Sequence, residues 1–148
     1  MTRFAQRTSV PADRSRAEVE RVLQRYGARG FGYSWERREG PKTELREFSD
    51  IVFDFKGRRI RLDVPMPTER EAGTTAKAEA ATRQRWRALL LVLKAKLEAV
   101  ESGISTLERE FLADILTEDG RTVGDILVPR ITEAVRAGRL LPPAGSGT

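Results

Sequence analysis

Two clusters of basic residues are the strongest candidates in this sequence for a ligand-binding site. The first places four cations within six positions, namely Lys56, Arg58, Arg59 and Arg61. The second comprises Arg83, Arg87 and Lys94, whose spacings of four and seven put them on nearly one face of a helix. Guanidinium and ammonium groups attract phosphates, so both clusters predict a surface that binds a polyanion.

Both clusters also have an interpretation without a ligand. Arg59 and Arg61 share one strand face with Asp63, which is equally typical of a solvated surface. The stretch 83–97 contains no acid, so its cations cannot pair within their own segment. Carboxylates further along the chain could pair with them instead, and the sequence favours neither pairing nor ligand binding. The candidate partners are Glu108, Glu110 and Asp114.

Three aromatic residues alternate along one short segment. Phe31, Tyr33 and Trp35 are separated by Gly32 and Ser34, which places their rings on one face of a strand. Tyr33 and Trp35 could stack on bases, as aromatic residues do on sheets that bind single strands. An aromatic triplet at strand spacing is more often part of a core, and the sequence favours that interpretation.

Histidine and cysteine are both missing from the chain. Their absence excludes zinc enzymes, Ser-His-Asp hydrolases, disulfides and thiolate metal sites. Asp54, Phe55 and Lys56 match the Asp/Glu-x-Lys pattern of metal-dependent nucleases, but the nearest further acid, Asp50, falls on the same strand. The sequence therefore predicts no catalytic site, no metal site, no cofactor and no enzymatic activity.

Charge is distributed unevenly along the 148 residues. The net charge is +5, yet residues 1–61 hold 15 Lys and Arg against 9 Asp and Glu, and residues 98–148 are net acidic. A basic half favours a polyanionic partner. No apolar run approaches the roughly 20 residues of a membrane span, and the first residues lack the apolar core of a secretory signal. We therefore expect a cytoplasmic protein that does not enter a membrane.

Hydrophobic periodicity predicts one helix followed by three strands. Val19, Val22, Leu23 and Tyr26 form a helical stripe within residues 16–26, and a capping box of Ser15 and Glu18 is expected to open this helix. Period-two alternation follows in three segments, and a tight hairpin is expected at 56–58. The expected strands lie at 31–35, 51–55 and 60–64.

A long helix over 78–101 is predicted to supply much of the core. Its apolar stripe contains Trp86, Leu89, Leu90, Leu93, Leu97 and Val100. Leu91 and Val92 widen the stripe, which favours a helix that is central to the core or buried on two sides.

Shorter helices are expected after Gly103. A capping box of Ser105 and Glu108 opens the first, and Thr122 with Asp125 opens the second, in which Pro129 predicts a kink or a break. The residues expected to face inward from the first are Leu107, Phe111, Leu112 and Ile115.

These elements predict a single α+β domain over residues 1–142, with a helix on a three-stranded antiparallel sheet, a long core helix and a helical C-terminal segment. Within it, residues 1–12 are expected to form a flexible, irregular arm and residues 66–77 a mobile linker. Residues 143–148 are expected to be a disordered tail.

Several stretches together resemble an uncharacterised family of small bacteriophage and prophage proteins. Among them are Arg-Tyr-Gly-Ala at 25–28, Leu-Asp-Val-Pro-Met-Pro at 62–67 and Arg-Trp-Arg-Ala-Leu at 85–89. The others lie at 8–11, 15–20, 94–98, 103–105 and 110–112. This resemblance implies a virus-derived protein in the cytoplasm of a bacterial host, and it brings no catalytic residue with it.

The order helix–strand–strand–strand–helix is also similar to that of double-stranded-RNA-binding domains. In that family a basic start to the second helix contacts phosphates across the groove. Residues 77–87 occupy the matching place here, without the Lys-rich signature of the family.

Three functions remain open at this level. The favoured one is a non-enzymatic phage accessory protein that binds DNA or RNA through its basic residues. The second is an interaction module that inhibits a host nuclease or defence protein. The third is a binder, or sponge, of anionic signalling nucleotides, which would work as a homo-oligomer.

Overall fold

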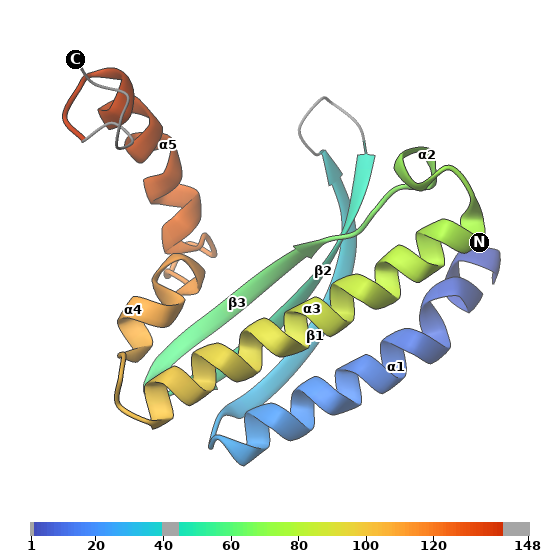
Figure 1. Cartoon of the computed structure of the whole chain (residues 1–148), viewed down its shortest axis with the longest axis horizontal. Coiled ribbons are helices and arrows are strands. Elements are labelled where there is room, and N and C mark those ends of the chain that lie inside the picture. Colours follow the sequence, from blue (N-terminus) through green and yellow to red (C-terminus); the bar gives the residue numbers. More distant parts are fainter. Residues whose placement is uncertain (1, 40–44, 141–148) are drawn as a thin grey trace.

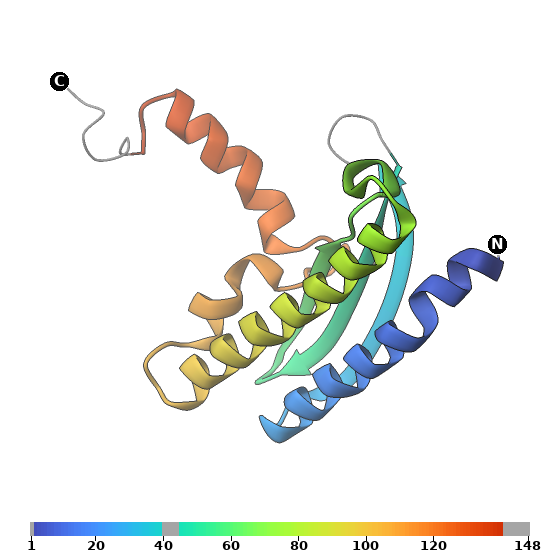
Figure 2. The same ribbon diagram turned by 45° about the vertical axis from the view of Figure 1, so that its right-hand side comes forward.

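Two long helices lie side by side across one face of a three-stranded sheet (Figures 1 and 2). The computed structural model describes residues 2–39 and 45–140, and the side chains of 14–36, 47–68 and 70–140. The predicted α+β architecture is confirmed. In chain order the elements are α1 (Thr2–Arg25), β1 (Arg29–Glu39), β2 (Leu45–Phe55), β3 (Arg58–Pro65), α2 (Glu69–Ala72), α3 (Thr75–Glu101), α4 (Leu107–Phe111), the 3-10 turn η1 (Leu112–Asp114) and α5 (Val123–Arg136).

The sheet is antiparallel in the order β1-β2-β3. Its β2–β3 hairpin turns through Lys56 and Gly57, both with positive φ (48° and 80°), which is the conformation that matches the twist of the two strands. The turn sets the register, so that Phe53 lies opposite Ile60 and both side chains are completely buried. The predicted tight hairpin and its inward-facing residues are therefore confirmed.

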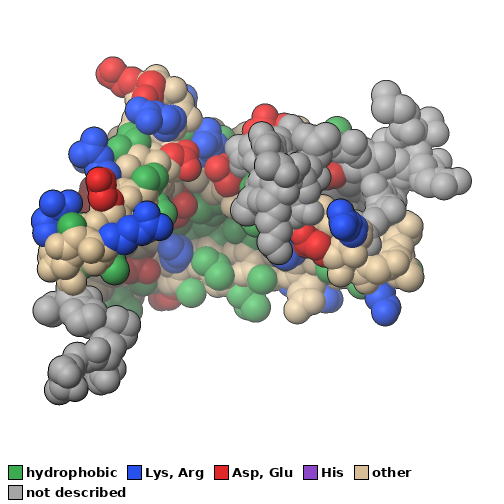
Figure 3. All heavy atoms as spheres, turned by 90° about the horizontal axis from the view of Figure 1, so that it is seen from above, with side chains coloured by type: hydrophobic (Ala, Val, Ile, Leu, Met, Phe, Trp, Pro, Cys, Tyr) green, Lys and Arg blue, Asp and Glu red, His purple; other side chains and the backbone are tan. Residues whose placement is uncertain are grey.

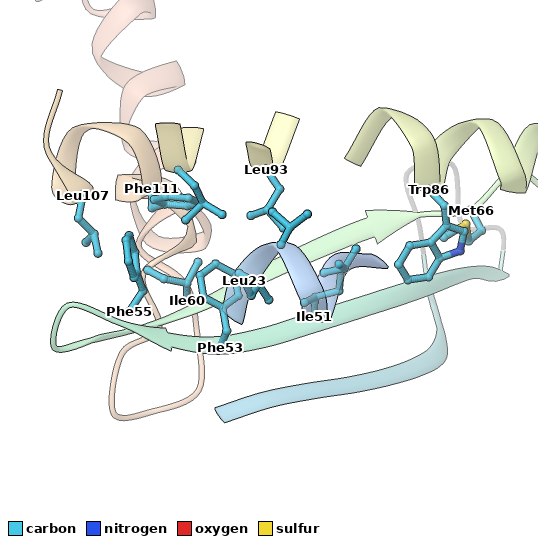
Figure 4. Packing of buried hydrophobic residues seen from close by; sticks show 13 residues of the cluster. Leu23, Ile51, Phe53, Phe55, Ile60, Met66, Trp86, Leu93, Leu107 and Phe111 are labelled. Atoms are coloured by element: carbon cyan, nitrogen blue, oxygen red, sulfur yellow. The ribbon is translucent and has the colours of Figure 1, made fainter. Parts of the chain in front are cut away.

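The core fills the space between the sheet and its helices (Figure 4). Trp86, Leu93 and Leu97 of α3 are buried against it, while Leu89, Leu90 and Val100 are partly buried. Helix α4 closes one end, where the rings of Phe53 and Phe111 meet edge to face with centroids 6.0 Å apart. The remaining buried apolar side chains of this cluster are Val19, Val22, Leu23, Ile51, Phe55, Ile60, Met66 and Leu107.

Helix α3 is buried on one side only. Leu91 and Val92 are 68% and 49% exposed, so the expectation that they widen a buried surface is wrong. Helix α3 lies on the sheet as an outer layer (Figure 2), so the side of α3 away from the sheet faces solvent even where it carries apolar residues.

The N-terminal helix is longer than predicted. It begins at Thr2, so residues 2–12, expected to be irregular, are helical, and Ser15 lies inside the helix rather than at a cap. Helix α5 likewise continues through Pro129, so no break occurs there. A proline removes one main-chain amide, and in both helices the remaining hydrogen bonds maintain the helix. Whether residues 1–12 are flexible stays a prediction.

The segment between the sheet and α3 contains more helix than expected. Met66 is buried, α2 forms within the stretch, and α3 begins at Thr75 after Thr74 accepts a 3.1 Å hydrogen bond from the Lys77 amide. The expected linker at 66–77 therefore contains helical residues at both α2 and the start of α3.

The C-terminal segment confirms one predicted cap and corrects another. Thr122 and Asp125 form the expected capping box of α5. Thr106, not Ser105, caps α4, because Ser105 donates instead to the Glu110 carboxylate at 2.6 Å. Leu112, expected to face inward, is half exposed, since the chain leaves α-helical geometry at η1. The expected tail at 143–148 lies outside the described residues.

Candidate nucleic-acid interface

The arginines of β3 are neutralised by carboxylates. We call Arg58, Arg59 and Arg61 the strand arginines. Arg59 lies directly opposite Asp54 across the hairpin and grips it with two hydrogen bonds, of 2.8 Å and 3.1 Å. This hydrogen-bonded pair lowers the pKa of Asp54 below its ordinary value and raises that of Arg59. The pair uses two of the five guanidinium donors of Arg59 and places a compensating negative charge beside it.

Arg61 is the most enclosed of the strand arginines, with a side chain only 20% exposed. Its guanidinium lies 3.0 Å from Asp63 and 3.5 Å from Asp125, and it donates to the Gly120 carbonyl at 2.9 Å. Arg61 therefore joins β3 to the segment that leads into α5. Its contacts are those of a structural ion pair.

Arg58 and Lys56 lie at the exposed end of the hairpin. The guanidinium of Arg58 is 3.8 Å from the Glu108 carboxylate, and the ammonium of Lys56 lies 5.6 Å from the centre of the Phe55 ring. The first cluster predicted from the sequence is thus brought together in space, but three of its four cations face an acid.

The five cations of α3 between residues 83 and 97 divide into two groups by flank. Arg85 donates to the Pro65 carbonyl at 2.8 Å and Lys96 to the Glu110 carbonyl at 2.6 Å, so both tie α3 to its neighbours. We call the other three, Arg83, Arg87 and Lys94, the helix cations. All three are exposed, and they form no hydrogen bond or ion pair with any residue that the structure describes.

The acids considered as partners for the helix cations have other environments. Glu108 faces Arg58, and Glu110 accepts the hydrogen bond from Ser105. Burial raises the pKa of Asp114, an effect that the charge of Lys96 partly offsets. Intramolecular pairing of the helix cations, the alternative that the sequence left open, is therefore wrong for the described part of the chain.

A second basic row lies on α1, where sequence reasoning missed it. Arg14, Arg21 and Arg25 are exposed and separated by seven and four residues, so they share one face of the helix. Their sequence spacing of seven and four could have identified them, because the helix cations show the same two spacings in the reverse order. Glu18 lies within the same row.

The two basic rows lie on neighbouring helices. Helices α1 and α3 run in the same direction on one sheet face (Figure 1), and the Tyr26 hydroxyl donates to Glu98 at 2.8 Å near their C-terminal ends. We call the exposed cations of these two rows the α1/α3 basic surface: Arg14, Arg21, Arg25, Arg83, Arg87 and Lys94. Arg59 and Arg61 alternate with buried Ile60, so they lie on the opposite sheet face and do not share this surface.

The aromatic strand residues divide between core and surface. Tyr33 packs against Trp86 with ring centroids 5.8 Å apart, and the guanidinium of Arg16 lies 4.6 Å from its centre. Tyr33 and Phe31 are therefore part of the core layer, the interpretation that the sequence favoured. Trp35 is 47% exposed and lies towards the far end of β1.

A cavity of about 340 Å³ opens between the end of α1 and the start of β1. Its polar lining consists of Glu20, Gln24 and Arg29, with a floor that includes Phe31 and Phe53. One arginine beside one glutamate gives no net positive charge for an anionic nucleotide. Among the described residues, no group of three or more acids is placed to hold a metal ion, and no helix is long and apolar enough to cross a membrane.

Comparisons with protein-family models, with curated proteins and with solved structures found no match to the chain. The order helix–strand–strand–strand–helix that is similar to double-stranded-RNA-binding domains is present in the structure. That likeness is one of element order alone.

Proposed function

We propose that this chain is a non-enzymatic nucleic-acid-binding accessory protein, and that the α1/α3 basic surface contacts the phosphates. The resemblance to phage proteins makes the cytoplasm of a bacterial host the expected place of action. The sequence predicted both the strand arginines and the helix cations as phosphate-binding residues. We do not include the strand arginines in the proposed interface, because they pair with Asp54, Asp63, Asp125 and Glu108.

One observation carries the proposal. Arg83, Arg87 and Lys94 are exposed on one helix flank, and no described residue neutralises them. Unpaired cations that share a face raise the local positive potential and attract a polyanion, whereas paired cations largely cancel their own field. The parallel row on α1 extends the same potential over a second helix.

The geometry favours a backbone-binding mode over base recognition. Long cationic side chains on two neighbouring helices can reach successive phosphates, which fixes affinity without reading sequence. Of the two residues considered for base stacking, Tyr33 is packed between Trp86 and Arg16, whereas Trp35 is 47% exposed. We therefore expect binding that depends strongly on salt and weakly on nucleotide sequence.

The test is a fluorescence anisotropy titration of labelled duplex and single-stranded DNA and RNA. The double variant Arg87→Gln/Lys94→Gln should weaken binding while keeping polar, helix-compatible side chains and the fold. The matched control is Arg70→Gln/Arg109→Gln, which removes the same charge from two exposed positions on α2 and α4.

We expect the control to bind nearly as tightly as the wild type. Equal losses in both double variants would show that net charge alone matters, and the proposed surface would be wrong. Wild-type protein without measurable salt-sensitive affinity for any of the four nucleic acids would overturn the proposed function itself.

A further inference from the structure

The helix cations occupy the flank of α3 that lies next to α1. Glu98 marks this flank, because its carboxylate accepts a 2.8 Å hydrogen bond from the Tyr26 hydroxyl of α1. Lys94 and Arg87 precede Glu98 by four and eleven residues, and both spacings return a side chain to nearly the same side of a helix. The opposite flank of α3 is tied to β3 and α4 by hydrogen bonds. The helix cations therefore border the line along which α3 packs against α1.

The basic row of α1 borders the same line. Arg16 marks the flank of α1 that lies over β1, since its guanidinium is 4.6 Å from the centre of the Tyr33 ring. Arg14 and Arg21 lie two residues before and five residues after Arg16, spacings that place them on the opposite side of the helix, and Arg25 follows Arg21 by four residues. On the sheet face α3 is the neighbour of α1 (Figures 1 and 2), so this row lies on the side of α1 towards α3. We call the line between the two rows the α1/α3 junction.

Cations of the two rows stand opposite each other at two levels of the α1/α3 junction. The hydrogen bond between the helices aligns position 26 of α1 with position 98 of α3. Because the helices run in parallel (Figure 1) and rise about 1.5 Å per residue, Arg14 comes level with Arg87, and Arg21 with Lys94, to within about one residue. No described residue forms an ion pair with these four cations. A phosphate between two such cations would be attracted by both, and it would offset their mutual repulsion.

The α5 end of the molecule shows a different distribution of charge. Basic and acidic side chains lie beside one another on its surface (Figure 3). On α5, Arg130 and Arg136 each lie three residues from Glu133, a spacing at which opposite charges are neighbours. Such alternation lowers the local positive potential, whereas the facing cations of the α1/α3 junction add to it.

We propose that a single strand of DNA or RNA lies along the α1/α3 junction, with its phosphates contacted from both sides. Each row extends over eleven residues, from Arg14 to Arg25 and from Arg83 to Lys94, which is about 16 Å in a straight line. A flexible single strand can follow that line throughout its length. In B-DNA about 16 Å is nearly half a helical turn, over which each stiff backbone winds to the other side of the duplex. This inference rests on the proposed function and adds the class of nucleic acid that the site takes.

Two glutamates on α1 provide a matched test of where the strand lies. Glu18 lies in the basic row, at a level between the two facing pairs, whereas Glu20 lines the cavity between α1 and β1. Both side chains are exposed, and glutamine is as compatible with a helix as glutamate, so both substitutions should retain the fold. Glu18→Gln and Glu20→Gln remove the same charge from one helix. A difference between them therefore reports local position and not net charge.

The test is a fluorescence anisotropy titration of a labelled strand of about 16 nucleotides and of its duplex, each in DNA and RNA form. The wild type should bind the single strand more tightly than the duplex at equal salt, although the duplex has the denser charge. Glu18→Gln should tighten single-strand binding roughly two- to fivefold, because it removes a repulsion of the size of an exposed charge pair. Glu20→Gln should change it less.

The outcomes separate this inference from the proposed function. Duplex binding as tight as, or tighter than, single-strand binding would overturn the inference and leave the proposed function intact. Equal tightening by Glu18→Gln and Glu20→Gln would show that the strand does not lie along the α1/α3 junction. Wild-type protein without salt-sensitive affinity for any of the four nucleic acids would contradict both.

Discussion

The strand arginines and the helix cations each comprise three basic residues, yet only the strand arginines face carboxylates within the described residues. On β3, each arginine lies within 4 Å of at least one carboxylate, supplied by the paired strand, by β3 itself, by α4 or by α5. On α3, the stretch 83–97 has no acid, and the helix cations form no ion pair with any residue that the structure describes. The difference shows that a count of cations says little until the backbone has determined which carboxylates they meet.

Helix α3 is anchored by a buried side that does not carry the helix cations. Leu93 is completely buried there. We expect Leu93→Ala to lower the free energy of unfolding by about 2–5 kcal/mol, as cavity-forming substitutions do. Leu91→Ala, two residues away and 68% exposed, should change it little. Urea denaturation of both variants measures the contrast, and equal effects would show that α3 is not attached by this face.

The strand arginines should contribute to stability where the helix cations do not. Arg61→Gln removes the contacts to Asp63, Asp125 and the Gly120 carbonyl, and should cost about 1–2 kcal/mol. Arg87→Gln, which breaks no contact within the described residues, should leave the urea midpoint unchanged. If Arg87→Gln were the more destabilising of the two, the division between structural and free cations would be reversed.

The Arg59–Asp54 pair should make the free energy of unfolding slightly dependent on pH. Because Arg59 lowers the pKa of folded Asp54, the stability from this pair is fully present above about pH 4 and is lost as the pH falls through the folded pKa. In Arg59→Gln the pKa of Asp54 should rise towards its ordinary value. NMR titration of the Asp54 carboxyl carbon measures the shift, and an unchanged pKa would mean that the pair does not persist in solution.

Local periodicity made much of the fold predictable. Alternation at 51–55 and 60–64, joined by Lys56 and Gly57, determines the hairpin register and therefore its buried side. The same register places Asp54 opposite Arg59, so the sequence already contained the signal for that ion pair. The stripe through Trp86, Leu93 and Leu97 was likewise sufficient to identify the inner side of α3.

What the sequence did not reveal depends on contacts between distant segments. Arg61 meets Asp125, 64 positions away, and no local pattern predicts such a pair. Leu91 and Val92 look like core residues until the layer order leaves them in solvent. Pro129 predicts a kink or a break, but helix continuity is decided by the whole element and not by one missing amide.

The most direct test of the difference between the two groups is the slope of log K against log salt for two triple variants. Each phosphate contact with duplex DNA contributes roughly 0.9 to that slope. Arg83→Gln/Arg87→Gln/Lys94→Gln should therefore flatten the wild-type slope by up to about 2.7 without changing stability. Arg58→Gln/Arg59→Gln/Arg61→Gln should keep the slope and lower the stability. A flattened slope in the strand variant with an unchanged slope in the helix variant would contradict the account.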